Sequence, residues 1–144
     1  MKINLLKSLF LILIVSFLSG CDDDVVGKWD PMEWKYQNVS EGIEIIKPAG
    51  KDKDHIKYAT QIKVNKPGAV DIVCKNYKTF WFEEYPDMTY ESDFRTQFQN
   101  SCCAMKIEGN TIHCEFFNTE QRPDNFTITI TAGDIFYQFK ITLN

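Results

Sequence analysis

Strict alternation of apolar and polar side chains is the feature that most constrains how this chain can fold. The alternation runs through residues 58–65, 70–75, 126–131 and 135–142. Successive side chains of a β-strand point to opposite faces, so each run predicts a strand with one apolar and one polar face. The turn residues Lys66-Pro67-Gly68 separate the first two runs. Strands of this kind pack as antiparallel sheets around a shared core.

A hairpin is predicted around the dipeptide Gly109-Asn110, which lies between two further alternating runs. A two-residue turn there pairs Glu108 with Thr111, Ile107 with Ile112, Met105 with Cys114, and Cys103 with Phe116. In this register every apolar pair falls on one face, and Lys106 and His113 share the other. A slip of one residue would expose the whole apolar set, so the agreement supports the register.

Helical patterning is scarce in the rest of the chain. Residues 88–99 carry Tyr90, Phe94 and Phe98 at a spacing of four, which fits a short helix or an irregular loop. The longest stretch without clear alternation is 76–101. Seven or eight short strands separated by turns predict an all-β fold, an immunoglobulin-like antiparallel β-sandwich.

The first 20 residues have the layout of a secretory signal peptide. Lys2 and Lys7 make its start positive, residues 9–18 form an apolar run broken by Ser16, and small residues precede Cys21. The apolar run is too short for a membrane-spanning helix, which needs about 20 apolar residues. We therefore expect residues 1–20 to be removed, 21–41 to be a tether and lead-in, and 42–144 to form one sandwich domain.

The segment Leu18-Ser19-Gly20-Cys21 resembles the bacterial lipobox, in which the cysteine thiol is diacylated and the leader is cut just before it. This resemblance implies that Cys21 anchors the protein in a membrane through palmitate-like acyl chains, because each buried methylene contributes about 0.8 kcal/mol. Asp22-Asp23-Asp24 resembles the surface-export signal of lipoproteins in Bacteroidetes-type bacteria. We therefore expect an outer-membrane lipoprotein that faces the cell exterior. A solvated acidic linker on a periplasm-facing protein is the alternative.

Several segments from about residue 58 onward share a further pattern. They are Pro67-Gly68 with the strand 70–76, Trp81, the hairpin 107–112, Asn118, Arg122 and the strand 126–130. Together they resemble the BACON family of Bacteroidetes surface proteins. The resemblance implies an immunoglobulin-like sandwich that binds carbohydrate or acts as a spacer. The chain departs from the family at Leu143-Asn144, where family strands usually end in glutamine, and in its long aromatic stretch 83–101.

The cysteines carry no metal-site pattern. Once Cys21 is lipidated, four remain in an exported and oxidising setting, and their spacing does not match a zinc site. We therefore expect neither a metal nor a cofactor. The alternation turns Cys74, Cys103 and Cys114 inward and Cys102 outward. Inward cysteines on opposing sheets allow one disulfide, Cys74 with Cys103 or Cys114, whereas the competing interpretation is that all are small buried hydrophobes.

The charge of the chain argues against nucleic-acid binding, and the placement of its histidines and glutamates argues against catalysis. Acidic residues outnumber basic ones by 20 to 16 and no stretch is strongly basic, which excludes the usual nucleic-acid interface. His55 and His113 are expected to be solvated, and neither lies near a nucleophile in the sequence. Glu83 and Glu84 would point to opposite faces of a strand, so they do not form an acid–base pair. We therefore predict that the protein is not an enzyme.

The stretch 76–101 is the candidate ligand-binding region, because binding groups usually lie on loops of a rigid scaffold. The candidate residues are the aromatic side chains Trp81, Tyr85 and Tyr90 with the carboxylates Glu84 and Asp87. Aromatic rings stack on the apolar faces of sugars while carboxylates bind hydroxyls. The acidity of the stretch favours neutral glycans. The alternative for Trp81 is a place in the core beside Phe80 and Phe82.

These features predict a non-catalytic cell-surface lipoprotein that binds a neutral glycan through an aromatic loop. The alternative is a structural or assembly lipoprotein that docks to a larger protein complex. An apolar surface patch of several hundred Å² would favour the second function.

The segment 29–34 contains two tryptophans, Trp29 and Trp34, which we expect to dock on the domain.

Overall fold

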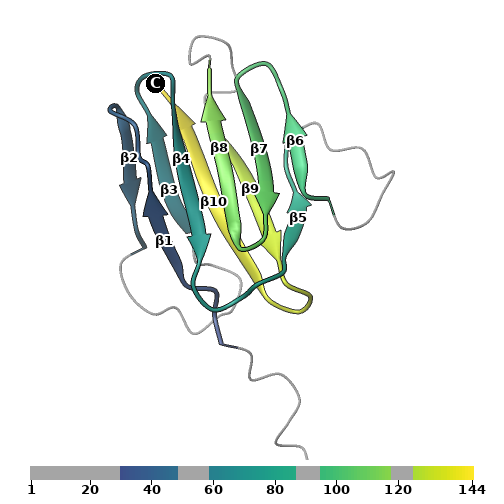
Figure 1. Ribbon diagram of the computed structural model, residues 1–144. Helices are drawn as coiled ribbons and strands as arrows, with labels where there is room; N and C mark the ends of the chain where they lie inside the picture. The colour runs from purple at the N-terminus through teal and green to yellow at the C-terminus, as the bar shows by residue number, and fades with distance from the viewer. Residues whose placement is uncertain (1–29, 49–58, 87–94, 118–124) are drawn as a thin grey trace, which may run out of the picture.

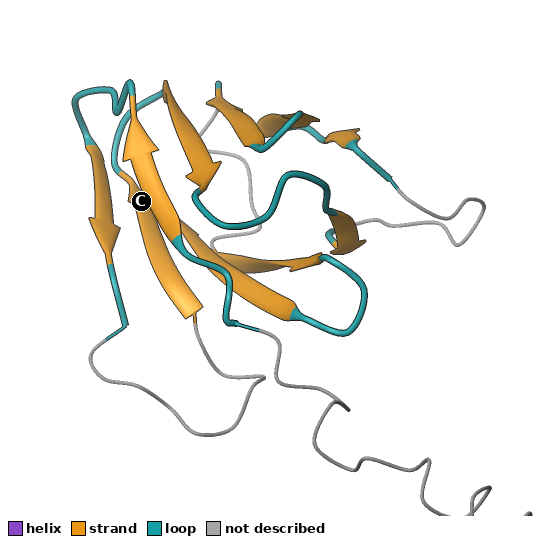
Figure 2. Ribbon diagram, turned by 60° about the horizontal axis from the view of Figure 1, so that its bottom comes forward, coloured by secondary structure: helices purple, strands orange, loops and turns teal. Residues whose placement is uncertain are grey.

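The computed structural model describes residues 30–48, 59–86, 95–117 and 125–144, and in these ranges the chain forms ten strands. The strands make two five-stranded sheets that face each other, as the views in Figures 1 and 2 show. The predicted all-β sandwich is therefore confirmed. Within the described ranges no helix is long and apolar enough to cross a membrane.

The order of strands within each sheet is as follows. The first sheet contains β1 (Trp34–Gln37), β4 (Gly68–Cys74), β8 (Thr111–Phe116), β7 (Cys103–Glu108) and β6 (Gln97–Gln99). The second sheet contains β2 (Ile43–Ile46), β3 (Ala59–Val64), β10 (Phe136–Leu143), β9 (Asn125–Thr131) and β5 (Trp81–Glu84). Neighbouring strands are antiparallel except β3 and β10, which run parallel.

The hairpin of β7 and β8 has the predicted register, with Ile107 opposite Ile112 and Met105 opposite Cys114. These four side chains are buried, whereas Lys106 and His113 are exposed on the outer face. Gly109 has a φ of 60°. Such a positive φ at the first central position matches a type II′ turn, whose twist suits a two-residue hairpin and which favours glycine there.

The alternation predicted for the longer strands is also confirmed. The inward-facing side chains of β3, β4, β9 and β10 are buried, among them Thr60, Ile62, Val64, Val70, Ile72, Cys74, Phe126, Ile128, Ile130, Tyr137, Phe139 and Ile141. Side chains from both sheets belong to one hydrophobic cluster, which fills the space between the layers.

The structure has more strands than the seven or eight predicted. The additional strands are short, three or four residues each, namely β1, β2, β5 and β6. A run of three or four residues is too short to show a clear period of two, which is why they were missed. Because β1 pairs with β4, the sandwich begins within 21–41, the range predicted to be a lead-in. Trp34 docks on the core as expected, whereas Trp29 lies outside the described residues.

The described cysteines are free thiols. Cys74 and Cys114 lie in the same sheet and not in opposing sheets, and Cys114 pairs with Val70, four positions along β4 from Cys74. At about 3.3 Å per residue this separates the two Cα atoms by about 13 Å, whereas a disulfide needs less than about 7 Å. Cys103 lies farther still, because its partner Phe116 pairs with Gly68. The structure therefore does not bring Cys74 to either proposed partner.

The outward orientation predicted for Cys102 is wrong, because its side chain is fully buried. Cys102 belongs to the turn before β7 rather than to the strand, so strand alternation does not apply to it. The side-chain oxygen of Asn100 organises this turn, since it accepts hydrogen bonds from the backbone N–H groups of Cys102 and Cys103 at 3.0 and 2.8 Å.

Candidate functional site

The structure separates the residues predicted to bind a ligand. Trp81 is half-buried on β5, Glu84 is exposed, and Tyr85 is buried. Tyr90 and Asp87 lie outside the described residues, as do Cys21 and His55. Phe80 and Phe82 are core residues with about 2% and 1% exposure, whereas Trp81 between them is only partly buried.

Tyr85 was expected to be an exposed stacking platform, but its ring is in the core. It stacks on Phe98 with ring centres 4.5 Å apart and planes at 6°, and it meets Phe82 edge to face. The guanidinium group of Arg95 donates a hydrogen bond to the Tyr85 hydroxyl and lies 5.8 Å from the ring centre. Both faces of this ring are therefore occupied by protein, and Tyr85 cannot serve as a sugar platform.

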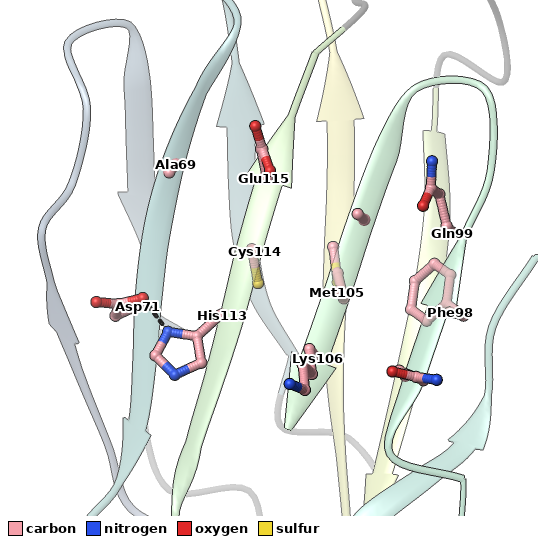
Figure 3. A pocket seen from close by; sticks show the side chains of 11 residues that line it. Ala69, Asp71, Phe98, Gln99, Met105, Lys106, His113, Cys114 and Glu115 are labelled. Carbon is pink, nitrogen blue, oxygen red and sulfur yellow. Dashed lines mark hydrogen bonds and ion pairs between the residues drawn. The ribbon is translucent and has the colours of Figure 1, made fainter. Parts of the chain in front are cut away.

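A trough of about 630 Å³ lies instead on the outer face of the first sheet (Figure 3). Alternate residues of a strand face outward, so each of four neighbouring strands contributes to it. The outward-facing lining residues are Ala69 and Asp71 of β4, His113 and Glu115 of β8, Ala104 and Lys106 of β7, and Gln97 and Gln99 of β6. The trough is thus built by regular strands and not by a loop.

The strand register arranges the lining in two rows that cross the sheet. One row runs through Asp71, His113, Lys106 and Gln97, all with polar side chains. The neighbouring row runs through Ala69, Glu115, Ala104 and Gln99. Two alanines in the second row leave depth beside the longer side chains of the first, which accounts for the hollow.

One edge of the trough is held by a network of hydrogen bonds around Asp71 of β4. The imidazole Nδ1 of His113 lies 2.7 Å from one carboxylate oxygen, and the amide of Asn38 donates to the other at 2.6 Å. The hydrogen bond from Asn38, followed by that from His113, lowers the pKa of the Asp71 carboxyl group. Asn38 has a φ of 50°, a left-handed conformation that asparagine tolerates better than most residues.

A second carboxylate network lies at the end of the hairpin. Lys106 forms an ion pair with Glu108, and their hydrogen bond lowers the pKa of the Glu108 carboxyl group. The other ring nitrogen of His113, Nε2, lies 3.6 Å from Glu108. His113 was expected to be simply solvated, but its side chain, although 46% exposed, is held between two carboxylates.

The trough presents hydrogen-bond donors and acceptors of several kinds. It offers carboxylate and amide acceptors together with amide, imidazole and ammonium donors. The Cys114 thiol belongs to the lining but points inward, and its burial raises its pKa, so it stays protonated and poorly nucleophilic. The described part of the chain contains no cluster of three or more His, Cys, Asp or Glu residues able to hold a metal ion.

The sequence interpretation missed most of this trough. Of its lining residues, only Gln97, Phe98 and Gln99 belong to the stretch 76–101 in which a site was expected. The available signal was the pair of outward-facing alanines, Ala69 and Ala104, on strands whose other outward residues are mostly large and polar. That signal becomes visible only once four strands are placed side by side.

Comparisons with known proteins support the fold. No family model and no curated protein matches the chain. A structure solved by NMR, of a protein from Bacteroides thetaiotaomicron, is similar to it with a TM-score of 0.51 and 23% sequence identity. The alignment covers 84% of this chain and 94% of that protein. At this level of identity the likeness concerns the sandwich alone.

Proposed function

We propose that this chain is a non-catalytic lipoprotein of the outer-membrane surface, anchored through Cys21, that binds a neutral glycan in the trough of the first sheet. The observation that carries the proposal is the polar row across four strands, Asp71, His113, Lys106 and Gln97. This row holds donors and acceptors side by side on rigid strands. Hydroxyl groups both donate and accept hydrogen bonds, so a glycan matches such a mixed lining.

The charge of the trough supports a neutral ligand. Its carboxylates, Asp71 and Glu115, lie among the ammonium group of Lys106 and the imidazole of His113, so neither sign dominates. A strongly charged ligand would meet like charge within the row, an anion at Asp71 and a cation at Lys106. An open hollow of about 630 Å³ is within the size range of small-molecule sites.

A structural or assembly role has less support. The large hydrophobic side chains that are exposed in the described residues are Val39, Phe117 and Phe136. Phe136 lies on β10 of the second sheet, whereas Phe117 directly follows β8 of the first. Docking surfaces are contiguous apolar patches of several hundred Å², and three exposed hydrophobic side chains among the described residues supply little such surface.

The proposed binding site is tested by filling the trough. Ala104→Tyr places a large ring between Glu115 and Gln99, whereas Thr111→Tyr places the same ring on the same sheet face outside the lining. We expect the full-length protein to bind neutral glycans on an array, Ala104→Tyr to lose this binding, and Thr111→Tyr to keep it. Equal binding by both variants would refute the trough as the site. Absence of binding to any neutral glycan would favour the assembly role.

The proposed anchor is tested separately. Cys21→Ala removes the acceptor thiol, so the cells should incorporate no labelled palmitate into the protein, and the protein should leave the membrane fraction. Cys74→Ala is the matched control because it removes a buried thiol and should leave labelling unchanged. Label retained by Cys21→Ala would contradict the anchor.

A further inference from the structure

The chain enters the sandwich at one end of the molecule, which we call the entry end. β1 begins there with Trp34 opposite Cys74, the last residue of β4. The turn of the β7–β8 hairpin lies at the same end, because the Cys74 N–H donates to the Asn110 carbonyl at 2.8 Å and the Asn110 amide donates to the Cys74 carbonyl at 2.9 Å. Figure 1 shows the entry end at the bottom, together with the β9–β10 connection. The start of β4 and the turn 40–42 lie at the opposite end.

The segment just before β1 is fastened to the entry end by side chains of the β4–β5 connection. The Asn76 amide donates to the Pro31 carbonyl at 2.9 Å, and the Asn76 side-chain oxygen accepts from the Glu33 N–H at 2.9 Å. The Tyr77 hydroxyl donates to the Asp30 carbonyl at 2.6 Å. These three hydrogen bonds form a clamp that fixes the position of Asp30 on the sandwich.

Further contacts strengthen this clamp. The Lys75 N–H donates to the Glu33 carbonyl at 2.7 Å, and the Lys75 ammonium pairs with the Glu33 carboxylate at 2.9 Å. The side chain of Met32 is buried and belongs to the hydrophobic core. A segment that combines backbone hydrogen bonds with a buried side chain unfolds with the domain rather than before it. The clamped segment is therefore part of the sandwich.

The clamp lies close in sequence to the proposed lipid anchor. Asp30 is nine positions after Cys21, so at about 3.3 Å per residue the two are at most about 30 Å apart. A coil of that length spans about 17 Å on average. β4 alone rises about 20 Å from Gly68 to Cys74. If the entry end pointed away from the lipid, Asp30 would lie more than about 20 Å above it, farther than the average span.

We propose that the clamp orients the sandwich on the membrane, so that the entry end faces the lipid surface and the trough opens sideways. This inference rests on the anchor at Cys21 in the proposed function and does not depend on what the trough binds. The strands of the first sheet run from the entry end to the opposite end, and the trough lies on their outer face. Asp71, in its polar row, is three residues from Cys74 along β4, or about 10 Å from the entry end. A ligand therefore reaches the trough from the side.

The orientation is tested with the lipidated full-length protein in vesicles whose headgroups carry a short-range acceptor dye. A donor dye is attached at Lys78→Cys, next to the clamp, or at Glu41→Cys, at the opposite end, and both positions are exposed. The described native thiols are buried, so they should label slowly. We expect energy transfer to the lipid to be at least about twofold stronger from the donor at Lys78→Cys, because about 20 Å of strand separates the two ends.

A lengthened tether provides the matched control. Inserting about 20 glycine and serine residues between Asp24 and Val25 gives an average span of about 30 Å, which exceeds the length of β4, so the two donors should then transfer equally. Equal transfer from the two donors with the native tether would overturn the orientation, and so would a difference that survives the insertion. Protein that does not float with the vesicles would instead refute the anchor at Cys21, and the orientation with it.

Discussion

Asp71 shows how neighbouring side chains fix the orientation of one carboxylate on the outer face of the first sheet. Its carboxylate accepts from Asn38 on one side and contacts His113 on the other, so both oxygens are engaged. These partners fix the orientation of a side chain that would otherwise rotate freely at the edge of the trough. A ligand would therefore meet an ordered acceptor.

The lowered pKa of Asp71 predicts how stability depends on pH. A carboxyl group whose pKa falls on folding stabilises the native state above its unfolded value of about 3.9, and this contribution is lost as the pH falls through the folded value. Asp71→Asn should therefore be less stable than the wild type at pH 7, and the difference should shrink below about pH 4. Urea midpoints measured across this range test it. A pH-independent difference would contradict the assignment.

Because Tyr85 is buried, we expect its substitution to lower the stability of the protein rather than its binding of a ligand. Because its ring stacks on Phe98 in the core, Tyr85→Ala should cost about 3–5 kcal/mol, as for other buried aromatic residues. Tyr85→Phe keeps the stack and loses only the hydrogen bond from Arg95, so it should cost about 1 kcal/mol. Urea unfolding monitors both variants. An unchanged midpoint for Tyr85→Ala would restore the exposed-platform interpretation.

Among the elements, the β7–β8 hairpin has the most complete agreement between pattern and structure. Ile112→Ala should cost about 2–5 kcal/mol, because it leaves a cavity beneath a fully paired strand. Thr111→Ala, the neighbour that faces outward, should change stability by less than about 0.5 kcal/mol. Denaturant midpoints of the two variants provide the check, and equal effects would mean that the register is wrong.

The four short strands illustrate the limit of periodicity at the scale of elements. They include the edge strands of both sheets, where each has one neighbour only: β1 and β6 in the first sheet, β2 and β5 in the second. Their outward residues include Lys35, Gln97 and Gln99, polar side chains that discourage pairing with another molecule. An edge strand is hydrogen-bonded to one neighbour only and makes few core contacts. A strand of three or four residues is enough for this, and so short a run shows little alternation of apolar and polar residues.

At the scale of the whole molecule, the described cysteines behave as part of the hydrophobic core. Burial, followed by the neighbouring Cys102, raises the pKa of Cys103 to about 12, so its thiol stays protonated. Alkylation of the native protein should therefore be slow. After unfolding without reductant, mass spectrometry should find all four described cysteines modified, namely Cys74, Cys102, Cys103 and Cys114. Two unmodified cysteines would instead demonstrate a disulfide.

The sequence by itself determined the six longer strands and which of their faces are buried. Alternation is a local property, so residues such as Ile62, Ile72 and Ile128 reveal their burial from their immediate neighbours. The hairpin register followed as well, since both strands are joined by two residues. The sequence also predicted that Trp34 docks on the domain, although it did not predict the place.

Only the tertiary structure decided which strands are neighbours, and the trough depends on that choice. The trough joins residues that are more than 40 positions apart, such as Asp71 and His113, because β4 pairs with β8. Pairing between distant strands is set by the packing of the whole core, and no local pattern encodes it. The sequence thus placed the expected site in an aromatic stretch, whereas sheet order assembled polar rows elsewhere.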